Sequence, residues 1–396
     1  MESIREIFKI GHGPSSSHTM GPKKAAELFR AAYPETSAFR VTLYGSLAAT
    51  GKGHLTDKAV LDALSPIPVE LLWEPKKFLP FHPNAIKFEA LSEKKDLIAE
   101  KTIYSIGGGS ILEENQSLEK QSIYPISTMK AILDWCQSKG RKFWEFVKEY
   151  ENPDIWDYLH EVWKVMTEAI ERGIDEEGVL PGHLHLGRKA SSYYVKAKGF
   201  RGALKRRSMV YAFALAVAEE NAAGGKIVTA PTCGSSGVLP AVLYLLYKYN
   251  EFSENKILKA LATAGIIGNL VKKNASIAGA DVGCQGEIGT ACAMASAAAA
   301  QLFGGTAAQI EYAAEMGIEH HLGLTCDPIG GLVQIPCIER NPLAAARALD
   351  CCTFAILSDG RHRISFDQVV AAMKQTGHDL PHIYKETSLG GLAILE

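Results

Sequence analysis

Hydrophobic and polar positions follow two different periods along this chain. In the first third, Phe39, Val41 and Leu43 alternate with more polar neighbours, and this period of two is typical of a half-buried strand. A helix is expected before that strand, from Pro22, which suits a first helical turn, to Pro34. The same alternation predicts further strands at Ile67–Trp73, Ala85–Leu91 and Asp96–Ser105.

From Ser127 onward the period becomes helical and strand signals nearly vanish. The pattern predicts helices at Met129–Gln137, Phe143–Tyr150, Ile155–Arg172, Ser208–Ala222, Ser236–Tyr249, Asn255–Leu270, Glu287–Phe303, Ala307–Met316, Pro342–Leu357 and Phe366–Gln375. We therefore expect an α+β protein with a small N-terminal α/β domain (residues 1–125), a helical linker (126–157) and a larger all-α domain (158–396).

Composition and charge narrow the class of protein. The chain has 396 residues, 47% of them hydrophobic and 22% charged, which is typical of a globular protein of more than one domain. The formal charge of −2 argues against nucleic acid as a partner. The longest apolar runs, such as Val238–Tyr247, fall short of the roughly 20 residues that span a bilayer, so no membrane partner is expected. Because charged residues occupy the N-terminus where a signal peptide would be apolar, we expect a cytoplasmic protein.

A cytoplasmic location affects how the eight cysteines are interpreted, because a reducing compartment favours metal binding or catalysis over disulfides. Cys136, Cys351 and Cys352 lie in helical patterns and are expected to pack in the core. Cys284, Cys326 and Cys337 instead lie in turns rich in glycine or proline. Three thiolates are one short of a closed metal site, and an open coordination position suits a Lewis acid. Three unconnected turn cysteines remain the alternative.

Two loops of small residues precede helices and offer hydroxyl and backbone donors for an anion. The first contains Ser15, Ser16, Ser17 and Thr19 around His18, and simple helix capping is the alternative use of its serines. The second, Ala230–Gly237, contains Ser235 and Ser236. Its Cys233 is either a reactive thiol of lowered pKa or a residue packed in a tight turn.

Two further turns contain histidine. His54 follows Gly51-Lys52-Gly53, which lacks the spacing of a phosphate-binding loop. It is either an exposed proton-transfer group or an ordinary surface histidine. In the turn Phe81–Asn84, His82 and Asn84 have side chains that can orient a substrate.

Taken together, these motifs closely resemble those of the iron–sulfur-dependent L-serine dehydratases of bacteria. The resemblance covers essentially the whole chain in the same order, and it rests on Ser15-Ser16-Ser17-His18-Thr19, Tyr44-Gly45-Ser46-Leu47, Gly51-Lys52-Gly53-His54, His82-Pro83-Asn84, Ala230–Gly237, Gly283-Cys284-Gln285-Gly286-Glu287, Thr325-Cys326-Asp327-Pro328 and Ile335-Pro336-Cys337.

The resemblance implies a β-type domain joined to an all-α catalytic domain that holds a 4Fe–4S cluster through Cys284, Cys326 and Cys337. The iron without a cysteine ligand would bind the hydroxyl of L-serine, and the products would be pyruvate and ammonia, without pyridoxal phosphate. His54 is the expected base, with His18 as the rival. The active site is expected between the domains, with the substrate carboxylate against Ser15–Thr19 and with Ser235 and Ser236 as a second expected contact. A homodimer is the family expectation.

Some members of this family end in a cysteine that is a fourth cluster ligand, whereas this sequence ends Thr387–Glu396 without one. The resemblance then implies water, hydroxide or a small anion on the fourth iron, greater oxygen sensitivity and a shorter activation lag. Two alternatives stay open: a regulator that binds an amino acid and uses the cysteines as a redox or zinc sensor without turnover, and a related lyase for threonine or another small hydroxy acid.

Overall fold

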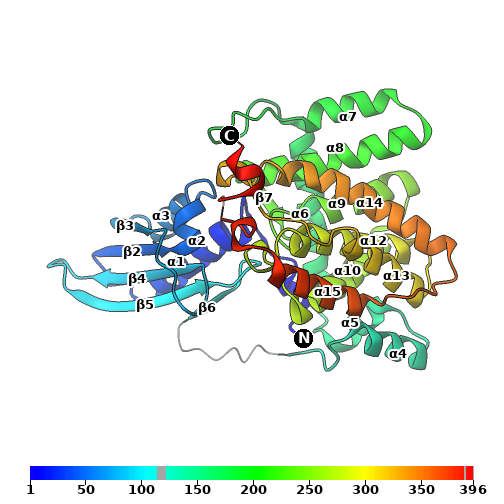
Figure 1. Ribbon diagram of the computed structural model, residues 1–396, viewed down its shortest axis with the longest axis horizontal. Helices are drawn as coiled ribbons and strands as arrows, with labels where there is room; N and C mark the ends of the chain where they lie inside the picture. The colour runs from blue at the N-terminus through cyan, green and yellow to red at the C-terminus, as the bar shows by residue number, and fades with distance from the viewer. Residues whose placement is uncertain (114–121, 388, 396) are drawn as a thin grey trace.

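The computed structural model describes residues 1–113, 122–387 and 389–395. Figure 1 shows a small sheet-containing part at one end of the molecule and a larger helical part at the other. This confirms the predicted α+β class, with its N-terminal α/β domain and its larger helical domain. Ser388 and Glu396 of the C-terminal tail lie outside the described residues, as do residues 114–121. No described helix is long and apolar enough to cross a bilayer.

The smaller domain is a five-stranded sheet in the order β3-β2-β4-β5-β6. β2 pairs with β3 in parallel, and the other neighbours are antiparallel. The strands are β2 (Ala38–Tyr44), β3 (Val69–Glu74), β4 (Ala85–Leu91), β5 (Leu97–Ser105) and β6 (Ile111–Glu113). The helices are α1 (Gly21–Ala32), α2 (Gly45–Thr50) and α3 (Thr56–Leu64).

One face of this sheet is covered by α1 and α3. Phe29 of α1 and Val60 of α3 pack with Val41 and Phe88 in a core of buried side chains. The predicted strands are present within a few residues. The elements α2, α3 and β6 were not predicted, because the two helices are shorter than three helical turns and β6 has only three residues.

The larger domain is helical, as predicted. It contains α4 (Met129–Lys139), α5 (Phe143–Tyr150), α6 (Ile155–Asp175), α7 (Ala190–Gly199), α8 (Gly202–Ala222), α9 (Val238–Asn250), α10 (Glu254–Asn274), α11 (Gly279–Val282), α12 (Thr290–Leu302), α13 (Ala307–Glu319), α14 (Cys337–Leu357) and α15 (Phe366–Asp379). α7 was not predicted, and α14 begins five residues before Pro342, so Cys337 lies in its first turn.

The alanine-rich helix α12 lies at the centre of this domain, with its alanines buried. Small side chains allow neighbouring helices to approach closely: a Cβ on Gly317 of α13 would lie 2.6 Å from the Cα of Ala293. The run of small residues is therefore a close-packing surface. Cys136, Cys351 and Cys352 are buried in the same hydrophobic core, as expected for cysteines in helical patterns.

The N-terminal segment joins the two parts. Ile4, Ile7 and Phe8 are fully buried in the helical domain's core. The following strand β1 (Ile10–His12) pairs antiparallel with β7 (Lys226–Val228) of the helical domain. The chain then enters the α/β domain through the π-helical turn η2 (Ser16–Met20), which places His18 at the junction of the domains. The domain boundaries at residues 125 and 157 remain a proposal from the sequence.

Candidate active site

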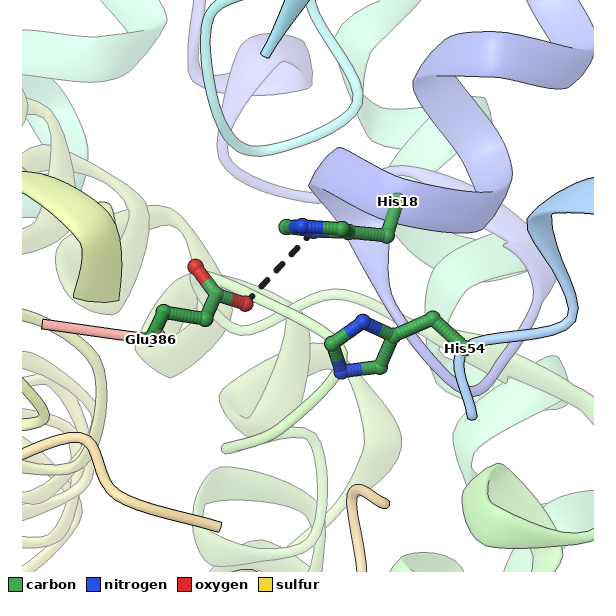
Figure 2. A group of neighbouring side chains, drawn as sticks. All are labelled: His18, His54 and Glu386. Carbon is green, nitrogen blue, oxygen red and sulfur yellow. Dashed lines mark ion pairs between the residues drawn. The ribbon is translucent and has the colours of Figure 1, made fainter. Parts of the chain in front are cut away.

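Two histidines face each other at the junction of the domains. His18 belongs to η2, and His54 lies in the turn between α2 and α3. Their ring centroids are 4.4 Å apart and their planes are inclined by 51°. Figure 2 shows both side chains pointing toward Glu386 from the C-terminal segment. His54 is only 1% exposed, so the expectation of an exposed turn histidine was wrong. The turn is enclosed because Gly53 lies against the backbone of Gly331 in the helical domain.

Neighbouring hydroxyl groups determine which nitrogen of His54 carries the proton. Nδ1 of His54 lies 3.0 Å from Oγ1 of Thr50, and that hydroxyl donates its own proton to the Ser46 carbonyl at 3.0 Å. A hydroxyl has one proton to donate, so Nδ1 of His54 must be the donor in this pair. Nε2 therefore keeps its lone pair, and it has no hydrogen-bond partner within the described ranges.

The same argument applies to His18. Its Nε2 lies 3.0 Å from Oγ of Ser46, and that hydroxyl donates to the Glu386 carbonyl at 3.3 Å. Nε2 of His18 is therefore a donor, and Nδ1 accepts from Oγ of Ser17 at 2.9 Å. Both nitrogens of His18 are engaged, so His54 is the better placed of the two to accept a proton.

Two threonines hold the histidine backbones in place from opposite sides. The Thr19 hydroxyl donates to the carbonyl of His54, and the Thr56 hydroxyl donates to the carbonyl of His18, each at 2.6 Å. Thr19 adjoins His18, and Thr56 lies two residues after His54. Each histidine segment therefore donates one hydrogen bond to the backbone of the other. They fix the two turns relative to each other.

Burial keeps both imidazoles neutral near pH 7. Desolvation lowers the pKa of His54 to about 4. Desolvation also lowers the pKa of His18 well below its usual range, and the neighbouring His54 adds to this effect. A neutral imidazole is the form that can accept a proton.

Glu386 reaches this pair from the far end of the chain. One carboxylate oxygen lies 3.6 Å from Nδ1 of His18. Its backbone N–H donates to the Cys326 carbonyl at 2.7 Å. Burial, followed by the negative charge of Cys284 and Asp281, raises the pKa of Glu386 to about 8. Sequence reasoning missed this residue, because a single glutamate in a tail without periodicity carries no signal.

Three cysteines gather near Glu386: Cys284 and Cys326 are buried, and Cys337 is half-buried. Cys284 follows α11, Cys326 lies in the turn after α13, and Cys337 begins α14. The hydrogen bond from Cys326 is the largest effect that lowers the pKa of Cys284 to about 6, and Arg340 also lowers it. Burial and the negative charge of Cys284 raise the pKa of Cys337. The three turns that the sequence singled out therefore converge, because Cys284 affects the pKa of both other thiols.

The surroundings of these thiols fit a soft metal centre. A Cβ on Gly279 would lie 2.9 Å from Sγ of Cys326 and 2.8 Å from Oε2 of Glu287, so this backbone must be glycine to approach the thiols. Arg340 lies close enough to hydrogen-bond Cys284. Thiolates are soft ligands, and cationic or N–H donors around them are typical of iron–sulfur and zinc sites. Three thiols leave one coordination position for another ligand.

The remaining predicted site residues divide into two groups. The hydroxyls of Ser15 and Ser17 bond within their own loop: His18 N donates to Oγ of Ser15 at 3.1 Å, and the two hydroxyls lie 3.3 Å apart. Ser235 bonds to Thr232 at 3.1 Å and is likewise engaged. These contacts match the capping use that the sequence left open. Ser16 is buried in the same loop.

Asn84 and Ser236 are different, because each has a buried polar atom without a partner among the described residues. Oδ1 of Asn84 and Oγ of Ser236 have no hydrogen bond, although these residues are 1% and 0% exposed. An unpaired buried polar atom is costly and is expected where a ligand completes the bonding. His82 accepts a hydrogen bond from the Asn84 backbone at 3.1 Å.

Cys233 is buried and packs against Met20. Its sulfur lies 3.3 Å from Sδ of Met20, and burial together with Glu287 raises the pKa of its thiol. Of the two alternatives for this residue, the tight-turn packing is the one observed.

Two buried histidines at the junction of the domains and three cysteines, linked by the segment that contains Glu386, form the candidate active site. Comparison with known proteins identifies the family. Residues 88–393 match the model of the serine dehydratase alpha chain, and residues 3–68 match the model of the serine dehydratase beta chain. The chain belongs to the serine dehydratase family.

Curated relatives align over their whole lengths. The chain is 39% identical to the L-serine dehydratase of Streptomyces coelicolor, over 99% of this chain and 98% of the relative. It is 40% identical to that of Haemophilus influenzae, over 100% and 99% of the two chains. It is 41% identical to that of Helicobacter pylori, over 99% and 98%.

Proposed function

We propose that this protein is an L-serine dehydratase that converts L-serine to pyruvate and ammonia. The observation that carries the proposal is His54: a buried neutral imidazole whose Nε2 has no hydrogen-bond partner among the described residues. Its neighbour His18 lies beside Glu386, whose backbone bonds to Cys326. The full-length similarity to proteins named L-serine dehydratase supports serine as the substrate.

We infer that Cys284, Cys326 and Cys337 hold a 4Fe–4S cluster and that pyridoxal phosphate takes no part. When bound, the cluster supplies an iron with an open position, a Lewis acid that helps the substrate hydroxyl to leave. Arg340 contributes a positive charge and hydrogen bonds to the thiolate side of this centre, with its own guanidinium anchored to the Thr325 carbonyl at 2.7 Å.

His54 removes the α-proton of L-serine. Nε2 accepts the proton, and Nδ1 keeps its own proton by donating to Thr50. The crossed hydrogen bonds of Thr19 and Thr56 prevent the ring from drifting as charge develops on it. His18 is a positioning residue: it is neutral, so it does not repel the imidazolium that forms, and it links Ser46 to Ser17.

Asn84 and Ser236 orient the substrate through their unpaired atoms. Oδ1 of Asn84 accepts from the substrate ammonium group, and the Ser236 hydroxyl donates to the carboxylate. Ser15, Ser16, Ser17, Thr19, His82 and Ser235 complete the proposed binding loops around them. The burial of the four hydroxyl residues of the first loop and of Ser235 excludes water from the reacting atoms.

The chemistry balances without an external reagent. The Cα–H bond gives its proton to His54, the Cβ–O bond breaks, and the departing hydroxide takes that proton back from His54 and leaves as water, with 2-aminoacrylate as the product. That enamine tautomerises to the imine and takes up one water molecule, which yields pyruvate and ammonia.

The test is an anaerobic assay of pyruvate from L-serine with iron-reconstituted protein, recorded together with its visible spectrum and with L-threonine as a parallel substrate. Pyruvate formation together with iron–sulfur absorbance is the expected result. Absorbance without pyruvate would overturn serine as the substrate. Zinc binding without colour or turnover would favour the sensor alternative.

Cytoplasmic location and a homodimer belong to the same proposal. Sedimentation of the reconstituted protein tests the dimer, with a single species of about twice the 42.9 kDa chain mass as the expected result.

A further inference from the structure

A cavity lies between the two domains, and neither the three cysteines nor His18 and His54 line it. Its volume is about 1000 Å³, and its walls come from the segment Arg5–Gly13, α1, α3, α6 and the turn before β7. This volume is large enough for a small organic ligand. Pockets between domains are a common place for such ligands.

The lining of this cavity contains charges of both signs with an excess of positive charge, and its acidic residues are Glu6, Glu27, Asp62 and Glu161. Its basic residues outnumber the acidic ones by two, and they are Arg5, Lys9, Lys23, Lys24, Lys58 and Lys226. Lys9 is paired with Glu6 at 2.9 Å, and Arg5 is paired with Asp154 outside the cavity at 2.9 Å. The other four lysines have no carboxylate within ion-pair distance in the part of the chain that the structure describes.

The positive charge of these lysines affects the pKa of a neighbouring histidine. After desolvation, the largest influence that lowers the pKa of His12 is the charge of Lys23, followed by that of Lys226. Burial lowers the pKa of Lys9 to about 8, even though Glu6 partly compensates. A bound anion would relieve this repulsion, since it places a negative charge among the positive charges of the lysines.

Apolar side chains complete the cavity. Ile10, Leu55, Ala59 and Tyr158 line it beside the lysines. Such a lining suits a ligand with an organic part as well as a charged group. Lysine ammonium groups are compact charges that bind phosphate oxygens well.

We propose that this cavity binds a small phosphorylated organic anion. The lysines neutralise the phosphoryl group, and the apolar wall formed by Leu55, Ala59 and Tyr158 contacts the remainder of the ligand.

The cavity shares a wall with the catalytic pair. Thr19 lines it, and the hydroxyl of Thr19 holds the His54 carbonyl at 2.6 Å. Leu55, the residue after His54, also lines it, at a backbone φ of 55°. A ligand that presses on this wall changes the position of His54 and so regulates turnover; this regulatory part rests on the proposed function.

The test is calorimetric titration of the holoprotein with inorganic phosphate, pyrophosphate and glycerol phosphate, at physiological ionic strength and with the visible absorbance monitored. The pocket variant is Lys23→Gln with Lys226→Gln. The matched control is Lys94→Gln with Lys374→Gln, which removes the same charge from exposed lysines that do not line the cavity. Citrate serves as an anion without phosphorus.

We expect glycerol phosphate to bind the wild type and the control equally, and the pocket variant about tenfold more weakly or worse, the usual cost of losing a charge-assisted hydrogen bond. The absence of binding to the wild type, or equal weakening in both variants, would overturn the site. Citrate binding as tightly as glycerol phosphate would overturn the phosphoryl preference.

Calorimetry needs no turnover, so it tests the site independently of the proposed function. In the active enzyme, we expect glycerol phosphate to change the KM for L-serine in the wild type and not in the pocket variant. Binding without any change in KM or kcat would overturn the coupling to His54 and leave the anion site intact.

Discussion

The carboxylate of Glu386 lies 3.6 Å from Nδ1 of His18, although the two residues come from opposite ends of the chain. The contact exists because the C-terminal segment returns to the junction of the domains, as Figure 1 shows. There the Glu386 N–H bonds to the carbonyl of Cys326, and Leu392 N bonds to Asp327 at 2.8 Å. The C-terminal segment thus links the cysteine centre to the histidine pair.

Replacing the carboxyl group of Glu386 tests this link. We expect Glu386→Gln to lower kcat by about 10- to 100-fold, the usual cost of losing a partner that orients a site residue. Iron content should not change, because the bond to Cys326 comes from the Glu386 backbone. The measurements are pyruvate formation and bound iron per chain. Glu319→Gln, at an exposed position, is the control, and equal losses in both variants would contradict the role of Glu386.

The two histidines should differ in their effects. We expect His54→Ala to lower kcat by roughly 10² to 10⁴, the range for removal of a general base. His18→Ala should lower kcat less, because His18 positions the site and its nitrogens are already bonded. Exchange of the α-proton of L-serine with D₂O, measured by NMR, separates the roles. Exchange that survives in His54→Ala but not in His18→Ala would reverse the assignment, and His160→Ala is an exposed control.

The pH dependence of kcat/KM follows from the lowered pKa of His54. A base acts only when it is unprotonated, so activity is lost as pH falls through the pKa of the free enzyme's base. With that pKa at about 4, the acid limb should lie well below the ordinary histidine value of 6.5. We therefore expect kcat/KM to be independent of this group between about pH 5 and pH 7. An acid limb centred near 6.5 would show that the base is not desolvated as described.

We expect all three cysteines of the proposed cluster site to be required for iron binding and activity. Cys284→Ser, Cys326→Ser and Cys337→Ser should each abolish both the visible absorbance and pyruvate formation, because each removes a thiolate ligand. Cys351→Ser should retain both, since Cys351 is buried in the helical core. Iron analysis and the spectrum of reconstituted protein are the measurements. Full activity in any of the first three variants would refute the ligand assignment.

A substitution that adds one methyl group at Gly279 tests how closely the backbone packs against the thiols. In Gly279→Ala the new Cβ would lie 2.9 Å from Sγ of Cys326, so we expect lower iron content and a loss of stability of about 1–3 kcal/mol from overpacking. Gly199→Ala is the matched control, because no atom lies within 4 Å of its Cβ position. Iron content and the thermal midpoint would be compared. Normal iron content in Gly279→Ala would show that this backbone does not limit the centre.

The fold class was predictable from the sequence. Period-two alternation around Val41 and helical periodicity after Ser127 depend on local residue order alone, since side chains repeat along a strand or helix with a fixed geometry. The three-residue strands β1 and β7 were not predicted. Each is stabilised by pairing with the other, and the two strands lie far apart in the sequence.

The site itself depended on tertiary structure. The sequence identified His18, His54 and the three cysteines as candidates, but it assigned His54 to an exposed turn. Burial between two domains lowers the pKa of His54, and the Thr50 hydroxyl determines its tautomer. Glu386 joins the site from a tail without any pattern. Burial, proton position and contacts between distant segments arise only when the chain folds, because they depend on neighbours in space and not on neighbours along the sequence.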